Sequence, residues 1–521
     1  MTDWRDHDLT LARMAEQTCR RTARQELLVD HELRLTGEQT LDAAARFAGR
    51  LSSLGLARGS HVALLAPTGV RHMVAFLAAQ RIGLVTCTLH AREPAGSLAR
   101  LLDWVDADAL VCHPQYQDKA RASVAGSQRR PRLISLGDET AADFAFSWSE
   151  AASAAPAPAA PVREDDLAVI VLSSGSTGTA KGVLQTHRGI VASARNGQAF
   201  ASDLGTQTTA LISVASSFAA WLWGTTTVLY AGGKLVLWSG FDAAQFADIV
   251  GRERPDLVPM VPTMARLLPP EVDRDPRLAS IRTVPLGGEA PSRADVERLL
   301  RWGARDVRAM YLSAESGRAA STWCSHREML AGKWGSAGRV VPGAELRIVD
   351  PDGRIDAALP PGTVGEIALR GPSVARGYWK DAERTGRFFQ DGWWRSGDLG
   401  YLDADGFLFI RGRLDNVINT GGIKVSGEEI EAALLRCPGV RQAVVVGEAD
   451  ERWGQRIVAH LVAPGLDAAA VERNLEQVDA LAAFKRPKEF RFHESLPVGA
   501  TGKLDRRALR SATRTPEEPS S

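Results

Sequence analysis

The chain has 521 residues, of which 45% are hydrophobic and 24% are charged, and its formal net charge is +1. This composition is typical of a globular protein with a sizeable core. Near-neutrality excludes recruitment of nucleic acid or an anionic membrane by overall charge. The five cysteines form no CxxC pair, which argues against a cysteine zinc site and indicates a reducing compartment. Because neither a secretory signal nor a run of roughly 18 apolar residues is evident, we expect a cytoplasmic protein without a membrane span.

The N-terminal part alternates strand-like and helix-like segments. Residues 60–69 and 84–89 predict strands, and residues 70–83 between them have the apolar spacing of a helix. This strand–helix–strand order predicts an α/β fold with a parallel sheet. Further along, alanine and proline dominate residues 151–163, a composition typical of an exposed connector or a subdomain joint.

The pattern changes after residue 371. Asp-Gly pairs flank apolar runs between residues 391 and 413, which predicts antiparallel strands. From residue 413 onward, helix-like and strand-like segments alternate in a smaller α+β unit. We therefore expect two domains, residues 1–412 and 413–521, with a disordered tail.

The loop SSGSTGTAKG at residues 173–182 follows an apolar, strand-like run and precedes a helix-like segment. Glycines allow backbone N–H groups to turn inward, while hydroxyls and one lysine add donors for an oxyanion such as polyphosphate. The residues with these properties are Ser173, Ser174, Gly175, Ser176, Thr177, Gly178, Thr179, Lys181 and Gly182.

Two better-known loops do not match this segment. A Walker loop requires glycine where Ala180 stands, and a nucleophile elbow requires its first glycine where Ser173 stands. A Ser/Lys amidase and a flexible, solvated loop remain as alternatives.

The segment LSSGSTGTAKGV resembles the phosphate-binding motif of the adenylate-forming enzymes, which comprise acyl-CoA synthetases, peptide-synthetase adenylation domains and luciferases. Further motifs follow in the family's order between about residues 35 and 509, and the chain is most similar to a carboxylic acid–CoA ligase. The resemblance implies ATP, Mg²⁺ and coenzyme A as cosubstrates and cofactor. It also implies a large N-terminal domain with parallel and mixed sheets, helices and a β-barrel-like part, followed by a small, mobile α+β domain.

Two motifs in the middle of the chain imply contacts with the nucleotide. PLGGEAPS resembles the adenine-binding loop, so Gly288, Glu289 and Ala290 would lie along the purine. MYLSAES resembles the Tyr-Gly-x-Thr-Glu element, in which Tyr311 would stack on adenine and Glu315, with Thr177, would hold Mg²⁺. Here Ala314 replaces the threonine that bonds the α-phosphate and Leu312 replaces glycine, a departure that removes one hydrogen bond.

Further motifs imply the rest of the nucleotide site and the moving domain. Asp398, in RSGDLGYLDADG, would accept both ribose hydroxyls, and Arg413 would reach ribose or phosphate oxygens. Asp415 matches the hinge. Lys503, in LPVGATGKLDRRAL, matches the catalytic lysine. The paired Gly421 and Gly422 resemble those of CoA ligases, where this loop helps to form the pantetheine tunnel.

The resemblance also implies the walls of the acyl pocket. These are Phe218 and Trp221 from the segment VASSFAAWLWG, Gly287, Leu312 and Arg318. Trp221 and Trp223 are equally consistent with helix core, and Ser216 stands where many relatives carry histidine. Because Leu312 adds a side chain where deep pockets keep glycine, we expect a compact aryl or short-chain acid.

The implied reaction activates a carboxylic acid as an acyl-adenylate, releases pyrophosphate, and transfers the acyl group to CoA. Since the chain ends at residue 521, soon after Lys503, we expect no fused carrier domain. Loading of a separate carrier protein, nucleotide binding without turnover and luciferase-type oxidation remain as alternatives. The acid, the oligomeric state and the effect of the Leu312 and Ala314 departures stay open at this point.

Overall fold

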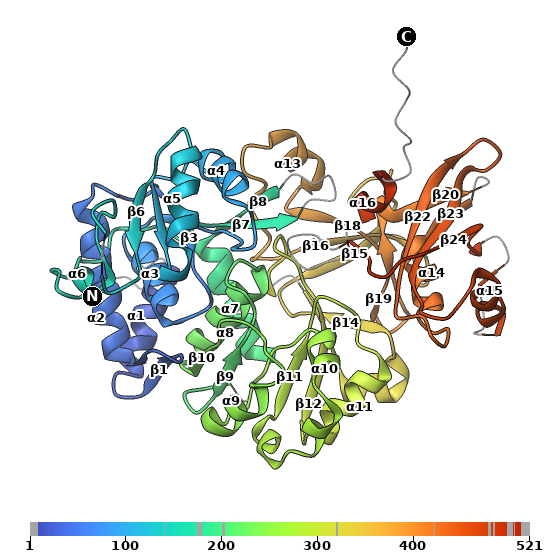
Figure 1. Ribbon diagram of the computed structural model, residues 1–521, viewed down its shortest axis with the longest axis horizontal. Coiled ribbons are helices and arrows are strands. Elements are labelled where there is room, and N and C mark those ends of the chain that lie inside the picture. Colours follow the sequence, from blue (N-terminus) through green and yellow to red (C-terminus); the bar gives the residue numbers. More distant parts are fainter. Residues whose placement is uncertain are drawn as a thin grey trace, which may run out of the picture.

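The computed structural model describes residues 9–139, 141–174, 180–200, 204–318, 321–420, 423–477, 481–482, 485–497, 504 and 506–511. These residues form four sheets with helices packed against them, and the C-terminal unit (orange to red in Figure 1) lies at one end of the molecule. The expected α/β class, with a large N-terminal part and a smaller C-terminal unit, is confirmed. No helix in these ranges is both long and apolar enough to cross a membrane.

The first sheet has six strands in the order β6-β5-β3-β4-β7-β8. They are parallel up to β7, as predicted for β3 and β4, while β7 and β8 form an antiparallel hairpin. Helices link the parallel strands because each crossover must return the chain to the same end of the sheet. The strands are β3 (His61–Leu65), β4 (Val85–Thr88), β5 (Ala109–Cys112), β6 (Arg132–Ser135), β7 (Leu167–Ser174) and β8 (Ala180–Thr186). The helices of this part are α1 (Leu11–Arg21), α2 (Gly37–Ser53), α3 (Val70–Arg81), α4 (Ala95–Trp104), α5 (Gln117–Gly126) and α6 (Trp148–Ala152).

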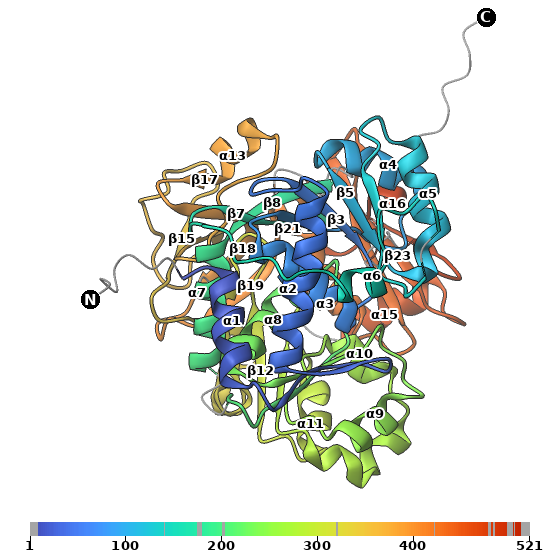
Figure 2. The same cartoon turned by 90° about the vertical axis from the view of Figure 1, so that its left-hand side faces the viewer.

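The second sheet has four strands in the order β2-β1-β10-β9. It shares one apolar core with the first sheet, because Leu28 of β1, Leu64 of β3, Phe76 of α3 and Trp223 of α8 belong to the same buried cluster. Figure 2 shows α1 and α2 on the outer side of this region. Its elements are β1 (Glu26–Val29), β2 (Arg34–Thr36), β9 (Thr209–Ile212), β10 (Lys234–Leu237), α7 (His187–Phe200), α8 (Ala219–Ala231), α9 (Phe246–Glu253) and α10 (Pro262–Leu267).

The third sheet is the part expected to be barrel-like. Its order is β11-β12-β13-β14-β19-β18-β16-β15, and β17 pairs with β18. All but the first pair, β11 and β12, are antiparallel. The Asp-Gly turns predicted this pairing for β17, β18 and β19. The strands are β11 (Thr283–Leu286), β12 (Asp306–Tyr311), β13 (Thr322–Ser325), β14 (Ser336–Val340), β15 (Glu345–Val349), β16 (Gly365–Arg370), β17 (Phe389–Gln390), β18 (Trp393–Leu402) and β19 (Leu408–Arg413), with helices α11 (Arg293–Arg301), α12 (His326–Glu328) and α13 (Ala382–Phe388).

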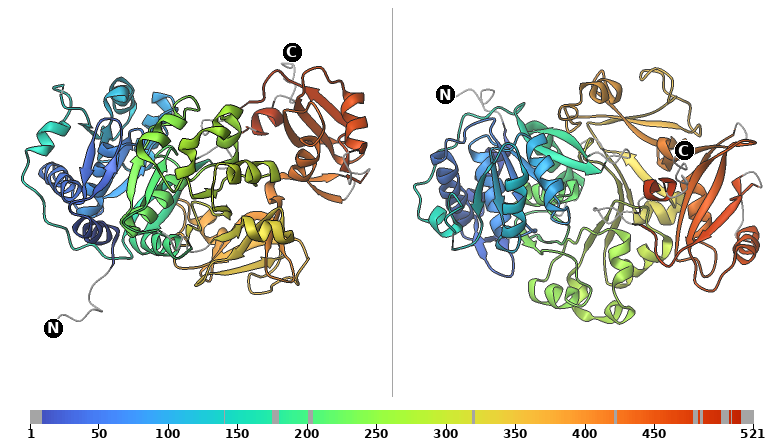
Figure 3. Two further views of the ribbon diagram at one scale, coloured as in Figure 1. Left: turned by 90° about the horizontal axis from the view of Figure 1, so that it is seen from below. Right: turned by 45° about the horizontal axis from the view of Figure 1, so that its top comes forward.

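The C-terminal unit has a sheet and an apolar core of its own. Five strands run in the order β21-β20-β23-β22, with β24 beside β23, and buried Ile418, Val445 and Leu475 belong to one cluster. The chain enters this unit directly after β19, and Figure 3 shows the unit (red) beside the orange part of the molecule. A single helical turn, η7 (Leu414–Asn416), makes the connection. The elements are β20 (Val417–Thr420), β21 (Ile423–Ser426), β22 (Gln442–Asp450), β23 (Gly454–Val462), β24 (Glu489–Phe492), α14 (Gly427–Leu434), α15 (Ala468–Gln477) and α16 (Arg506–Ser511).

Residues 151–163, predicted to be an exposed connector or a subdomain joint, are mostly exposed, but the segment is also anchored to two helices. Ala157 is buried, its N–H donates to the carbonyl of Ala45 on α2 over 2.8 Å, and its carbonyl accepts from Arg81 Nε on α3 over 2.9 Å. At Gly49 of α2, an added Cβ would lie only 2.1 Å from the Ala155 carbonyl oxygen. Small side chains therefore let this segment pack against two helices as a strap.

Candidate active site

The predicted phosphate loop lies between two paired strands. The sequence predicted a strand, the loop and then a helix, but β8 intervenes before α7. Ser173 on β7 pairs with Lys181 on β8, so the hairpin register fixes where the lysine leaves the sheet. Residues 175–179, and with them Gly175, Ser176, Thr177 and Gly178, lie outside the described residues, as does the side chain of Ser174.

Gly182 has a different role from the one that the sequence suggested. It lies within β8 opposite Leu172, and its φ is not in the left-handed region. An added Cβ would approach Ile170 at 2.8 Å, Trp104 at 2.9 Å and Trp379 at 3.0 Å. The glycine therefore gives room for packing rather than turning an N–H toward an anion.

A segment from the third sheet lies along β8 and carries a tyrosine toward the loop. Three backbone hydrogen bonds hold residues 376–379 against β8: Arg376 N to Leu184 O at 2.9 Å, Leu184 N to Gly377 O at 3.0 Å and Trp379 N to Gly182 O at 2.7 Å. The hydroxyl of Tyr378 donates to Glu315 Oε1 over 3.1 Å. This pairing joins the hairpin to the element that contains Glu315.

Lys181 and Glu315 face the same small region. Lys181 Nζ lies 5.6 Å from the ring centroid of Tyr378, and the Glu315 side chain is buried. Burial lowers the pKa of Lys181 below its ordinary value, and the nearby Glu315 carboxylate opposes that effect. The lysine ammonium can bind an anionic oxygen, and the buried carboxylate beside it can bind a metal cation.

Tyr311, Asp398 and Arg413 form a second polar group beside the first. The Tyr311 hydroxyl donates to Asp398 Oδ2 over 2.6 Å, and Arg413 Nε lies 3.5 Å from Asp398 Oδ1 and 3.3 Å from Asp415 Oδ1. Burial raises the pKa of Asp398, while Arg413 and Tyr311 oppose the shift. The structure thus brings together three predicted nucleotide residues and the predicted hinge residue.

Hydrogen bonds and close packing hold the segment from Glu315 to Arg318 in place. Ser313 Oγ accepts from the N–H groups of Glu315 and Ser316 at 3.2 and 3.0 Å. Gly317 has a left-handed φ of +59°, and an added Cβ would lie 2.5 Å from Ser193 Oγ. The carbonyl of Ala314, the position that lacks threonine, accepts from Gln185 Nε2 over 2.7 Å.

The predicted adenine loop follows β11. Gly288, with φ +85°, Glu289 and Ala290 are exposed, and Gly287 is half-buried. Glu289 Oε1 accepts from the N–H and the hydroxyl of Thr263, each over 2.6 Å. The glutamate thereby fastens the loop to α10.

The predicted acyl-pocket residues separate into two groups. Phe218 and Leu312 are half-buried, and the Phe218 ring meets His90 edge-on at 5.5 Å. Trp221 is instead 2% exposed, and its ring packs edge-on against His72 at 4.8 Å and Phe76 at 5.6 Å. The structure therefore favours the core alternative for Trp221.

Ser216 has a structural role. Its hydroxyl donates to the carbonyl of Ala66 over 2.7 Å. Gly421, Gly422 and Lys503 lie outside the described residues.

Comparison with known proteins agrees with this geometry. A family model for AMP-binding enzymes matches residues 12–379, and one for the C-terminal domain of AMP-binding enzymes matches residues 429–503. This chain belongs to the AMP-binding enzymes. The adenylate-forming superfamily that the motifs indicated is thus confirmed, and with it the expectation of an AMP-forming ligase.

Similar proteins cover nearly the whole of this AMP-binding enzyme. Feruloyl-CoA synthase from an Amycolatopsis species is 31% identical over 477 residues, which are 90% of this chain and 92% of that one. The fatty acid–[acyl-carrier-protein] ligase ScoC of Streptomyces coeruleorubidus is 30% identical over 485 residues, 91% of each chain. The ATP-bound structure of MatB from Rhodopseudomonas palustris is 25% identical with a TM-score of 0.82, covering 96% of this chain and 98% of that one.

The described residues of this AMP-binding enzyme fit a nucleotide and a divalent cation. Glu315 Oε1 accepts from Tyr378, and within the described ranges no hydrogen-bond donor reaches Oε2, which leaves an oxygen for a hard cation. Asp398 keeps accepting capacity beyond its bond from Tyr311, since each carboxylate oxygen can accept two hydrogen bonds. The described residues are therefore compatible with a nucleotide and a divalent cation, two of the groups that the resemblance implied.

Sequence reasoning missed Tyr378 and Gln185. Both act through contacts between segments far apart in the chain, Tyr378 with Glu315 and Gln185 with Ala314. The only signal for Tyr378 is the aromatic pair in RGYWKD, and no periodicity relates that pair to the loop.

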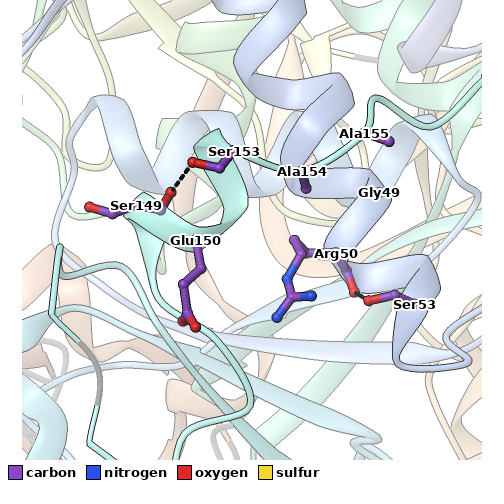
Figure 4. Close-up of a pocket in the computed structure, with 8 residues that line it drawn as sticks. All are labelled: Gly49, Arg50, Ser53, Ser149, Glu150, Ser153, Ala154 and Ala155. Carbon is purple, nitrogen blue, oxygen red and sulfur yellow. Dashed lines mark hydrogen bonds between the residues drawn. The ribbon is translucent and has the colours of Figure 1, made fainter.

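A separate hollow lies between α2 and the strap (Figure 4). Its hydroxyls donate to the Arg50 carbonyl from Ser53 over 2.8 Å, to the Ser149 carbonyl from Ser153 over 3.3 Å and to Asp138 Oδ1 from Ser149 over 3.1 Å. The Glu150 carboxylate accepts from Ser147 N in a helix cap, and the Arg50 guanidinium carbon lies 5.2 Å from the ring centroid of Phe146. Since the hydroxyls and the carboxylate are engaged within the protein, we assign no chemistry to this hollow.

Proposed function

We propose that this chain is an ATP-dependent acid–CoA ligase. It would convert a compact carboxylic acid into an acyl-adenylate with release of pyrophosphate, and then transfer the acyl group to CoA. The observation that carries the proposal is the convergence of Lys181, Tyr378 and Glu315 with Tyr311, Asp398 and Arg413. We call these six residues the nucleotide end.

The chemistry of this reaction needs charge stabilisation rather than a protein nucleophile. A carboxylate attacks the α-phosphorus, pyrophosphate leaves, and negative charge accumulates on the phosphates. Lys181 would counter this charge from β8, and Glu315 would hold Mg²⁺, which when bound neutralises phosphate charge. Tyr378 orients Glu315 through its hydroxyl, and Asp398 would bind the ribose hydroxyls.

The acyl acceptor can be CoA or a carrier protein, and similar proteins of both kinds are known. The names of similar proteins include a CoA synthase and an acyl-carrier-protein ligase. We favour CoA because Gly421 and Gly422 resemble the CoA-ligase loop. Transfer to a separate carrier protein is the second candidate, favoured by the similarity to ScoC.

The acid is proposed to be compact. Leu312 is half-buried and packs against the core cluster that includes α8, and Phe218 is the N-cap residue of α8. A long acyl chain would have to displace such groups, and overpacking typically costs about 1–3 kcal/mol. A single ring or a short chain would bury its surface without displacing them.

The test separates the two half-reactions. Lys503→Ala should slow adenylation by orders of magnitude, measured as acid-dependent pyrophosphate release, yet nearly preserve thioester formation from supplied acyl-AMP. Asp415→Pro should do the converse, because a fixed φ at the connection would hinder rotation of the C-terminal unit.

Each variant has a matched control. Exposed Lys488→Ala removes a lysine from the same unit, and Asp415→Ala removes the carboxylate without fixing the backbone. Release of ADP rather than AMP, or a thioester formed only on a carrier protein, would refute the CoA-ligase proposal. Equal loss of both half-reactions in Lys503→Ala and Asp415→Pro would refute the two-step division of labour.

A further inference from the structure

Strand β18 forms a bulge that ends at Asp398. Its pairing with β16 moves from Arg395 to Leu399 while β16 advances by only two residues, so that residues 396–398 lie opposite Ile367 alone. A bulge interrupts the ladder of backbone hydrogen bonds and turns a side chain in a new direction, and bulges are common beside active sites. The side chain that follows from this one is Asp398, a member of the nucleotide end.

Within the bulge, Ser396 bridges the two strands. Its hydroxyl accepts from the Asp398 N–H over 3.0 Å and donates to the Ile367 carbonyl over 2.7 Å. Ser396 is 8% exposed, so water has little access to replace these bonds. One hydroxyl thus ties the backbone of Asp398 to the neighbouring strand, at a place where the ladder itself provides no regular pairing.

The residue between Ser396 and Asp398 is held as well. Gly397 has a left-handed φ of +72°, which glycine adopts without strain, and its N–H donates to Glu366 Oε1 over 3.0 Å. Glu366 Oε2 in turn accepts from Arg395 Nη1 over 2.7 Å, and both of these side chains are buried. The bulge therefore has a defined shape, as the support of a ligand-binding group requires.

The carboxylate of Asp398 faces the other members of the nucleotide end. It accepts from the Tyr311 hydroxyl over 2.6 Å and lies 3.5 Å from Arg413 Nε. These contacts act on the side-chain oxygens, whereas Ser396 acts on the backbone from which the side chain projects. Binding of two neighbouring hydroxyls by one carboxylate needs both parts in place, because a misplacement of about 1 Å can cost as much as 100-fold in rate.

We infer that Ser396 is a positioning residue for Asp398 and thereby sets the preference of this chain for a nucleotide with both ribose hydroxyls. This inference rests on the proposed function, in which Asp398 binds those hydroxyls. Ser396 acts through Asp398 rather than on the nucleotide itself. Loss of its hydroxyl should therefore weaken the selection of ribose and leave the use of the acid nearly unchanged.

The experiment measures the selection of ribose by the full-length enzyme. Acid-dependent pyrophosphate release is assayed with ATP, 2′-deoxy-ATP and 3′-deoxy-ATP, together with the best substrate among acetate, butyrate, benzoate and cinnamate. Each preference is the ratio of kcat/KM for ATP to that for one deoxy analogue. We expect wild-type preferences of about 10- to 100-fold, because each missing hydroxyl removes a hydrogen bond to a charged group.

Three variants assign this preference to the Ser396 hydroxyl. Ser396→Ala should lower both preferences by about 3- to 10-fold and raise KM for ATP, while KM for the acid stays nearly constant. Ser396→Thr retains a hydroxyl, so its preferences should stay within about 2-fold of the wild type. Ser396→Cys keeps the size of serine but has a weaker acceptor, and we expect a fall of about 2- to 5-fold.

Ser336 provides a matched control in the same sheet. Its hydroxyl accepts from the Gly338 N–H and donates to the Leu408 carbonyl, each over 2.9 Å, and it too lies at a shift of strand register. It is 4% exposed, so Ser336→Ala removes the same two kinds of hydrogen bond from an equally buried place. No residue of the nucleotide end follows Ser336, and the ribose preferences of Ser336→Ala should equal those of the wild type.

Several results would overturn the inference while acid–CoA ligation stands. One is a wild type that uses both deoxy analogues as well as ATP. Others are wild-type preferences in folded Ser396→Ala, an equal fall in Ser336→Ala, or a loss of preference in folded Ser396→Thr. If Ser396→Ala does not fold, Ser396→Cys decides, and unchanged preferences in that variant overturn the inference.

Failure of the proposed function would be seen separately. If the wild type releases pyrophosphate with none of these acids, acid activation is overturned for them. The inference is then decided by binding, from the dissociation constants of AMP, 2′-deoxy-AMP and 3′-deoxy-AMP measured by calorimetry on the same proteins. A fall in the ratio of these constants in Ser396→Ala but not in Ser336→Ala would support the inference, and equal ratios in all proteins would overturn it.

Discussion

Buried polar groups of the nucleotide end share hydrogen bonds, whereas two buried groups near α8 lack them among the described residues. Tyr311, Glu315 and Asp398 each share a hydrogen bond with a second residue. His72 and Arg318 are buried, and within the described ranges the ring nitrogens of His72 and the Nε of Arg318 have no hydrogen-bond partner. The two groups differ in charge near neutral pH. Burial lowers the pKa of His72 to about 3, so that ring stays neutral, whereas burial lowers the pKa of Arg318 only to about 10 and this side chain keeps its charge.

The largest loss of activity is expected when Glu315, a hydrogen-bonded group of the nucleotide end, is changed. Glu315→Gln keeps an oxygen for the Tyr378 hydroxyl but removes the charge proposed to hold Mg²⁺. We expect acid-dependent pyrophosphate release to fall by about 100- to 1,000-fold, because stabilisation of phosphate charge is lost. Tyr378→Phe is the companion variant, in which only the orienting hydrogen bond is lost and the fall should be about 3- to 10-fold. Equal losses in the two variants would contradict the separate roles of charge and orientation.

The second prediction concerns His72 and the dependence of folding stability on pH. The unfolded chain protonates His72 below its ordinary pKa of 6.5, and the folded chain only near about 3, so folding free energy is lost as the pH falls through this window. At pH 5 the loss from this group is about 2 kcal/mol, from 1.36 kcal/mol per pH unit. His72→Leu should remove that part of the acid sensitivity.

Urea unfolding at pH 7.5 and pH 5 measures this difference. For each protein, the change in unfolding free energy between the two pH values is determined. This change is compared between the wild type and His72→Leu, because the other histidines titrate equally in both proteins. Parallel losses in the two proteins would mean that His72 is not neutral and buried in the folded state.

The smallest expected effect concerns pocket depth. Leu312→Gly should move the preferred acid toward larger members of a series, by about 10-fold in the ratio of kcat/KM values for a longer and a shorter acid. Adenylation of the shorter acid should change little, because the nucleotide end is untouched. An unchanged ranking, or a wild type that prefers palmitate, would show that position 312 does not set the depth.

Much of the fold was predictable from local pattern, and the site only in part. The alternation around β3, α3 and β4 and the Asp-Gly turns around β18 and β19 predicted the correct elements, because period and turn chemistry are local. The strand β8 was missed, since its sequence AKGVLQT begins inside the loop motif. The exposure of most of the strap was predicted from its alanine and proline content, but its anchoring to two helices was not, because that depends on the close approach that small side chains permit.

The contacts that complete the site could not be predicted from the sequence, because they join residues that are far apart in the chain. The motifs named Tyr311, Glu315 and Asp398, yet the bond from Tyr311 to Asp398 joins residues on β12 and β18, and only the third sheet brings them together. Likewise the sequence listed Arg318 among the pocket residues, but it did not indicate that this side chain is buried with no carboxylate of the described residues beside it, because burial depends on every element packed around it.

The β7–β8 hairpin has a consequence for how this chain can evolve. Glycine, serine and threonine in the connection between the strands suggest a segment that drifts freely in composition, and such segments ordinarily accept insertions and deletions as well. Here Ser173 pairs with Lys181 and Leu172 with Gly182. A slip of one residue would turn Lys181 to the opposite face of the sheet and bring a side chain with a Cβ against Trp104 and Trp379. Insertions and deletions that shift this pairing would therefore be purged by selection, so the pairing constrains the length of the connection as well as its chemistry.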